Sequence, residues 1–147
     1  MPNLTPKQKR HARIITLQII YAHALKGSDL DDTCAFMLDE RNPPMDNVIK
    51  YGKQLSNLIF MHAIEVDELI KNRSKNWEFD RITLIDKLIL RMALVEMIYV
   101  EEIPPKVSIT EGVEIAKQFS TEDSSSFING ILDAVYNEMV KKKENSV

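Results

Sequence analysis

The stretch that decides the fold is ITLIDKLILRMALVEMIYVEE, residues 82–102. Its apolar side chains fall on two stripes with helical spacing. One stripe contains Ile85, Leu88, Ile89, Met92, Val95 and Tyr99, and the other contains Leu90, Ala93, Leu94 and Met97. A helix that is apolar on two faces packs on two sides. We therefore expect this helix at the centre of an all-α domain.

Helical periodicity extends outward from this segment, because the chain has only four glycines and little β-branched alternation. Helices are expected at about 5–25, after Asp29, at about 46–72, from near Thr83, before Phe119, and at 127–140. Ser108 followed by Glu111 predicts a capping box. Gly130 is expected to allow a close helix approach, and residues 141–147 are expected to form a frayed tail.

Composition limits the possible functions. The 147 residues are 44% hydrophobic and 28% charged, as in an ordinary globular domain. No apolar run could span a membrane, no signal peptide is recognisable, and the single cysteine, Cys34, indicates a reducing cytoplasm. The three histidines are scattered, and no phosphate-binding loop or catalytic motif occurs. The sequence therefore predicts a binding protein without metal or cofactor, not an enzyme.

Charge is distributed unevenly along the chain. Residues 1–28 contain five basic residues and no acid, so this segment is +5; the net charge of −3 leaves −8 for the remainder. The basic side chains begin a helix, where cations oppose the helix dipole by about 0.3–1 kcal/mol each. A solvated helix start remains possible, but the pattern favours a polyanion as partner.

Three stretches resemble the NusB family of bacterial transcription antitermination factors: RHARIITLQIIYA (10–22), NWEFDRITLIDKLILRMALVEMIY (76–99) and IPPKVSITEGVEIAKQFSTEDSSSFINGILD (103–133). The resemblance extends over nearly the whole length of the chain. Thr110, Gly112 and Ser120 depart from the family's usual Asn, Ala and Gly.

The resemblance implies a NusB-like fold of two stacked three-helix units, roughly 1–76 and 77–143, forming a single domain over 1–147. It implies binding to boxA, a single-stranded RNA element, and to NusE, a small-subunit ribosomal protein. These would join RNA polymerase and other Nus factors in transcribing ribosomal RNA operons. The implied RNA-binding residues are Lys7, Lys9, Arg10, Arg13, Ser124 and Phe127, and the implied NusE-binding residues are Tyr21 and Asp86.

Three residues of this set have alternative interpretations. Tyr21 could belong partly to the core, with its hydroxyl reaching a partner. Phe127 could stack on an unpaired base or could belong to the core. Asp86 interrupts an apolar run, so its carboxylate needs solvent or a cationic partner.

Two alternative functions also remain open. NusB-like domains occur in ribosomal RNA methyltransferases, although the helical module is expected to fill these 147 residues and leave no cofactor domain. The chain could also be a helical scaffold that binds protein only.

Overall fold

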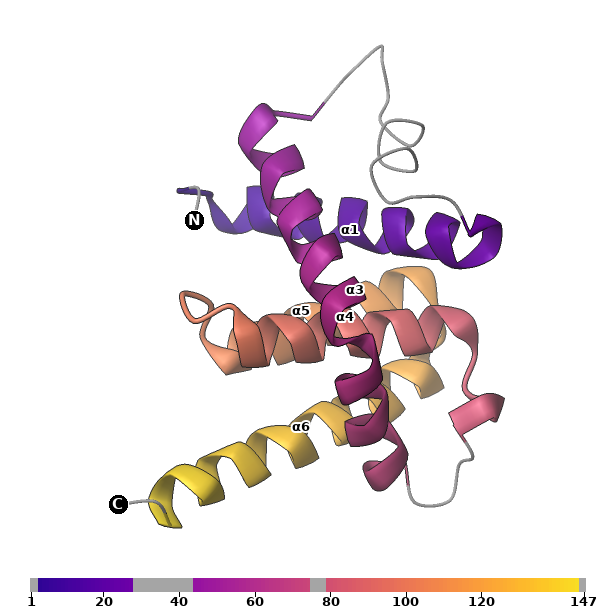
Figure 1. Cartoon of the computed structure of the whole chain (residues 1–147), viewed down its shortest axis with the longest axis vertical. Coiled ribbons are helices and arrows are strands. Elements are labelled where there is room, and N and C mark those ends of the chain that lie inside the picture. Colours follow the sequence, from indigo (N-terminus) through magenta and orange to yellow (C-terminus); the bar gives the residue numbers. More distant parts are fainter. Residues whose placement is uncertain (1–2, 28–43, 75–78, 146–147) are drawn as a thin grey trace. The chain divides into compact units, whose positions relative to one another are not determined.

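The computed structural model describes residues 3–27, 44–74 and 79–145 (Figure 1). Within these ranges every regular element is a helix, which confirms the all-α prediction. The elements are α1 (Pro6–Lys26), α3 (Asp46–Arg73), the 3-10 turn η1 (Phe79–Arg81), α4 (Leu84–Tyr99), α5 (Pro105–Phe119) and α6 (Glu122–Asn145). The short helix expected after Asp29 lies outside the described residues.

The chain forms two compact units, Met1–Met61 and His62–Val147. The boundary lies inside α3, earlier in the chain than the division expected near residue 76. None of the described helices is long and apolar enough to cross a membrane.

Local sequence signals define both ends of α1. The Thr5 hydroxyl accepts a hydrogen bond from the Gln8 backbone N–H at 3.2 Å, and the Gln8 side chain accepts one from the Thr5 N–H at 2.9 Å. This capping box satisfies two N–H groups that a helix start leaves unpaired. Gly27 ends the helix at φ 68°, a left-handed conformation that glycine adopts without strain.

In the first unit, α1 packs on α3 around Gly52. A Cβ added at Gly52 would lie 3.5 Å from the Ala12 carbonyl oxygen. The buried Thr16 hydroxyl lies 2.8 Å from the Ala12 carbonyl oxygen and 3.2 Å from the Gly52 carbonyl oxygen. A Cβ at this position would make ordinary van der Waals contact, so the two helices pass close to each other here, and the buried hydroxyl pairs at their crossing.

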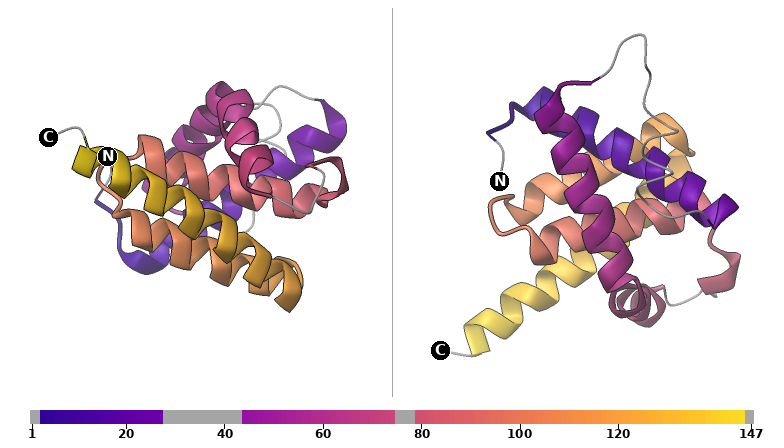
Figure 2. Two further views of the ribbon diagram at one scale, coloured as in Figure 1. Left: turned by 90° about the horizontal axis from the view of Figure 1, so that it is seen from below. Right: turned by 45° about the horizontal axis from the view of Figure 1, so that its top comes forward.

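In the second unit, α4, α5 and α6 pack against one another (Figures 1 and 2). Every α4 residue from Leu88 to Met97 except Arg91 is buried. This burial confirms the prediction, made from the two apolar stripes, that α4 packs on two sides. Helix α6 is the longest of the three, and its last turns extend past α4 and α5.

The capping box predicted at Ser108 and Glu111 is wrong. Helix α5 begins three residues earlier, at Pro105, whose fixed φ suits the first turn of a helix. Ser108 is buried inside the helix, and its hydroxyl donates to the carboxylate of buried Glu96 on α4 at 2.8 Å. The serine therefore serves tertiary pairing, which the spacing to Glu111 could not reveal.

The close helix approach predicted at Gly130 occurs at Gly112 instead. A Cβ added at Gly112 would lie 3.1 Å from the Ala93 Cβ and 3.3 Å from the Leu132 Cδ1. A Cβ added at Gly130 would meet nothing within 4 Å. Gly112 thus sits where α5 faces both α4 and α6, whereas Gly130 is exposed on α6.

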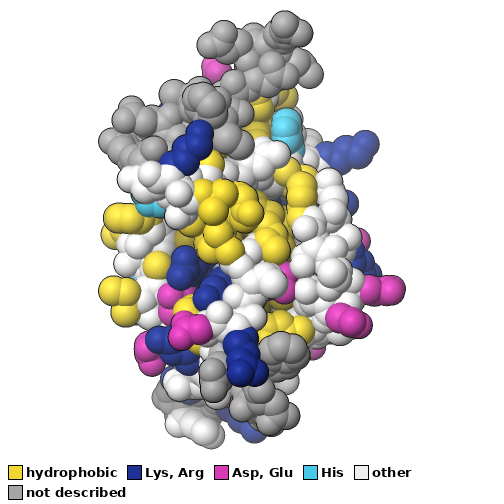
Figure 3. Space-filling view, turned by 90° about the vertical axis from the view of Figure 1, so that its right-hand side faces the viewer, with side chains coloured by type: hydrophobic (Ala, Val, Ile, Leu, Met, Phe, Trp, Pro, Cys, Tyr) yellow, Lys and Arg dark blue, Asp and Glu magenta, His cyan; other side chains and the backbone are white. Residues whose placement is uncertain are grey.

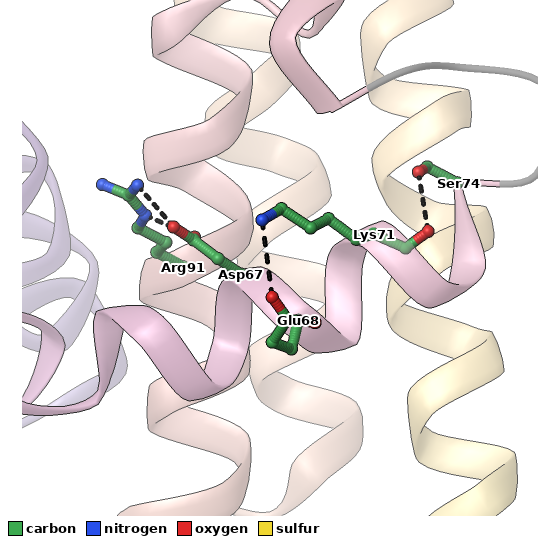
Figure 4. Close-up of polar contacts among 5 residues, drawn as sticks. All are labelled: Asp67, Glu68, Lys71, Ser74 and Arg91. Carbon is green, nitrogen blue, oxygen red and sulfur yellow. Dashed lines mark hydrogen bonds and ion pairs between the residues drawn. The ribbon is translucent and has the colours of Figure 1, made fainter.

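The second half of α3 contacts α4 through an ion pair, a hydrogen bond and a ring stack, and Figure 4 shows the ion pair. Arg91 makes a bidentate pair with Asp67, with Nε 2.7 Å from Oδ1 and NH2 2.8 Å from Oδ2. Tyr99 donates a hydrogen bond to Glu65, and the His62 ring stacks on the Tyr99 ring at 3.7 Å between centroids. The two parallel hydrogen bonds of the Arg91–Asp67 pair fix the orientation of the two side chains as well as the distance between them.

Helix α6 is longer at both ends than predicted. It begins at Glu122, so Ser124 lies in the first helical turn and not in a loop. It continues through Asn145, where the sequence predicted a frayed tail. Lys142 and Lys143 in the last turn favour this continuation, because cations near a helix C-terminus interact well with its dipole.

Candidate nucleic-acid interface

The basic residues predicted at the start of α1 differ in exposure. Lys7 and Arg10 are exposed, and Lys9 is half-buried. The first turn contains no acid. Arg13, in contrast, is only 2% exposed, which argues against the predicted contact between its guanidinium and a phosphate. The cationic group that the structure leaves accessible therefore consists of Lys7, Lys9 and Arg10, and we call it the basic start.

Tyr21, predicted to contact a protein partner, lies on α1 with 38% of its surface exposed. Leu25, one turn later, is 63% exposed. The His23 ring meets the Phe60 ring of α3 edge to face at 5.7 Å, which brings exposed Phe60 close to the end of α1. We call Tyr21, Leu25, Phe60 and Met61 the apolar surface of the first unit.

The second unit contains a cleft of about 180 Å³. Its lining comes from the segment before α4, from the first turn of α4 and from the start of α6. The lining residues are Arg81, Ile82, Thr83, Asp86, Asp123, Ser124 and Phe127. The structure thus brings together Ser124 and Phe127, both predicted to bind RNA, with Asp86, predicted to bind a protein partner. Phe127 is half-buried and forms part of the cleft wall.

The carboxylate of Asp86 has partners that the sequence did not indicate. It is only 5% exposed, and it accepts hydrogen bonds from the hydroxyls of Ser120 at 2.8 Å and Ser124 at 2.7 Å. The sequence predicted that the Asp86 carboxylate needs solvent or a cationic partner, and this prediction is wrong: among the described residues its partners are two neutral hydroxyls. Burial of the side chain argues against its direct contact with another protein.

Sequence reasoning missed Arg81 and Phe60. Arg81 lies between two predicted helices, and in the structure it is exposed and lines the cleft. The available signal was its position two residues before Thr83, since a threonine is a common N-cap and marks where a helix begins. Phe60 had no signal, because its helix is apolar on more than one face.

Charge is mixed on one face of the molecule. On the face drawn in Figure 3, Lys and Arg side chains lie among Asp and Glu side chains. This face presents no continuous basic surface, so the long-range attraction it exerts on a polyanion is limited.

Residues 10–137 match the model of the NusB family. The transcription antitermination protein NusB of Chloroherpeton thalassium is 36% identical over 134 residues, which are 91% of this chain and 64% of that relative. This chain therefore spans less than two thirds of the length of that relative.

Solved structures agree on the fold. NusB of T. maritima superimposes with a TM-score of 0.81 at 28% identity, over 97% of this chain and 99% of that one. A crystal structure of the antitermination factors NusB and NusE in complex with dsRNA superimposes with a TM-score of 0.80 at 23% identity, over 91% of this chain and 99% of that one.

Proposed function

The chain belongs to the NusB family, and from this membership we propose that it is a transcription antitermination factor that binds boxA RNA together with NusE. In this proposal the chain acts in the cytoplasm by binding, not by catalysis. It joins RNA polymerase and other Nus factors during transcription of ribosomal RNA operons.

The observation that carries the RNA-binding proposal is the cleft of the second unit. Its lining includes Arg81, Ser124 and Phe127, whose side chains carry a guanidinium, a hydroxyl and an aromatic ring. Single-stranded RNA is bound by stacking its unpaired bases on aromatic rings and by pairing cations with its phosphates. The cleft offers both kinds of contact within one small volume.

The basic start of α1 supports the same proposal. Lys7 and Arg10 are exposed on a helix whose capping box fixes its first turn. The buried Ile15 and Leu17 anchor the helix below them, so the cations are presented in a constant orientation. Phosphate contacts of this kind give affinity that falls as salt rises.

For NusE we propose the apolar surface of the first unit. Tyr21, Leu25 and Phe60 leave large apolar groups in water, although other residues of the same helices are fully buried. Interfaces are enriched in Tyr and Phe, whose rings bury much area at low entropic cost. Asp86 is left out of this surface because its carboxylate is buried.

The test is fluorescence anisotropy with a labelled boxA RNA, with and without NusE. Phe127→Ala should weaken RNA binding by about 1–3 kcal/mol, the usual worth of one stacked base. The matched control is Phe119→Ala, which removes a partly exposed ring of the same unit that does not line the cleft. Equal effects of the two variants would refute the role of the cleft.

A second comparison tests the NusE surface. Leu25→Ser should weaken NusE binding and leave RNA binding by the free protein unchanged. Val107→Ser is the control, since Val107 is also partly exposed but lies on α5 in the second unit. A protein-only scaffold would bind NusE normally and show no salt-dependent RNA binding.

A further inference from the structure

Two helices begin at the cleft with the same local arrangement. Thr83 caps α4, and its hydroxyl accepts a hydrogen bond from the Asp86 N–H at 3.4 Å. Thr121 precedes α6, and its hydroxyl accepts one from the Ser124 N–H at 3.0 Å. Asp86 and Ser124 therefore occupy equivalent positions, three residues after a threonine cap. Their side chains are joined by the 2.7 Å hydrogen bond from Ser124 to Asp86.

A third element ends at the same carboxylate. Ser120 is the residue at which α5 ends, and its hydroxyl donates to Asp86 Oδ1, while Ser124 donates to Oδ2. Each carboxylate oxygen thus has its own hydroxyl donor. A buried anion is costly unless it is paired and hydrogen-bonded, and here it lies at the N-terminal ends of α4 and α6, where negative charge is favourable.

This network is continuous with the wall of the cleft. Asp86 and Ser124 line the cleft, and Phe127 follows Ser124 by three residues on the same face of α6. Ser120 does not line the cleft. The orientation of the Phe127 ring therefore depends on where α6 begins, and the Asp86 carboxylate holds that beginning against α4 and the end of α5.

We propose that Asp86 is a positioning residue for RNA: its carboxylate, held by Ser120 and Ser124, sets the position of the Phe127 ring on which an unpaired base stacks. The proposal rests on the RNA-binding function proposed above. It assigns Asp86 an indirect role through α6, in place of a direct contact with a protein partner.

A second serine–carboxylate pair, between α5 and α4, provides a control that distinguishes a positioning role from a general effect on stability. Glu96 is a second buried carboxylate, and Ser108 donates to it at 2.8 Å, the same distance as from Ser120 to Asp86. Neither Glu96 nor Ser108 lines the cleft. Ser108→Ala therefore removes a matched serine–carboxylate bond without touching the cleft.

The experiment compares Ser120→Ala with Ser108→Ala in the full chain. The readouts are boxA RNA affinity at several salt concentrations and amide hydrogen exchange in residues 121–127. Ser120→Ala should weaken RNA binding roughly fivefold to tenfold, because the apparent Kd rises as fewer molecules hold the cleft in its competent form. Its salt slope should equal that of the wild type, since the variant keeps every cation that pairs with a phosphate. Exchange in residues 121–127 should become faster in this variant alone.

Asp86→Asn and Asp86→Ala form the second comparison. The amide keeps one acceptor oxygen and the shape of the side chain, so Asp86→Asn should retain more RNA affinity than Asp86→Ala. Unequal affinities of these two variants, with the helical circular-dichroism signal preserved, support the positioning role.

Three outcomes overturn the inference. Wild-type RNA affinity in Ser120→Ala refutes it while leaving the RNA-binding function intact. If Ser120→Ala and Ser108→Ala lower the RNA affinity equally, Asp86 only stabilises the fold and has no positioning role. A wild-type protein that does not bind boxA RNA removes the proposed function, and the positioning role with it.

Discussion

Two glycines in neighbouring helices provide a direct test of the packing. Gly112 in α5 is buried, and Gly130 in α6 is exposed. Both are flanked by helical residues on each side, so alanine is intrinsically better than glycine at each position by about 1 kcal/mol. Any difference between Gly112→Ala and Gly130→Ala therefore measures tertiary contacts.

The expected effects have opposite signs. At Gly130 the new methyl group meets nothing within 4 Å, so Gly130→Ala should stabilise the fold by about 0.4–1 kcal/mol. At Gly112 the methyl group would lie 3.1 Å from the Ala93 Cβ, closer than the usual 3.5–4.0 Å carbon contact. The Ala93 Cβ is attached to backbone and cannot rotate away, whereas the Leu132 Cδ1 at 3.3 Å can.

Overpacking of a well-packed core costs about 1–3 kcal/mol. Subtracting the intrinsic gain of about 1 kcal/mol, we expect Gly112→Ala to destabilise the fold by about 1 kcal/mol. The pair should therefore differ by about 2 kcal/mol, or roughly 4–8 °C in melting temperature for a chain of this size.

Urea unfolding followed by circular dichroism measures the difference. The midpoint should rise for Gly130→Ala and fall for Gly112→Ala, with unchanged slopes that show equal exposure of surface on unfolding. Equal stabilisation by the two substitutions would refute the close approach of α5 to α4. Destabilisation by Gly130→Ala would mean that its surroundings are more crowded than the structure describes.

Three further predictions concern the interface and one surface contact. Replacing Lys7 and Arg10 by alanine should flatten the plot of log affinity against log salt by about 0.7 for each phosphate that is no longer neutralised, and an unchanged slope would exclude pairing of these cations with phosphates. NusE should raise RNA affinity more than tenfold, over about 1.4 kcal/mol, and by linkage RNA should tighten the protein pair equally; equal RNA affinities of the free protein and the pair would leave two independent sites. The hydrogen bond to Glu65 raises the pKa of Tyr99 from 10.0 to about 12. The folded state then keeps a proton that the unfolded chain has released, so this contribution to stability is complete below pH 10.0 and disappears as the pH rises through about 12. Ultraviolet titration of phenolate should show this pKa fall toward its ordinary value in Glu65→Gln, and no change in that variant would contradict the bond.

The sequence by itself determined which segments are helical. Helix signals are local: the Thr5 cap, the Gly27 stop and the 3.6-residue apolar spacing all act within a few residues of the chain. The two stripes of α4 also identified a helix that is buried on more than one face, because both apolar stripes can be read within that one segment. The family resemblance came from the same local runs.

Side-chain partners were decided only by the tertiary structure. Periodicity states which residues share a face, but not what covers that face, so it could not reveal that Leu25 and Ile64 are exposed. The same limit applies to the two glycines, since a close approach depends on the neighbouring helix.

Polar residues show most clearly that the sequence does not identify side-chain partners. Ser108 matched a local capping pattern, yet its partner, Glu96, lies 12 residues earlier in the chain. Asp86 finds its serines 34 and 38 residues later. A hydroxyl or a carboxylate can pair with any donor or acceptor within about 3 Å, so its sequence neighbours do not identify that partner. Only the packing of α4, α5 and α6 places Asp86 where three helix ends meet.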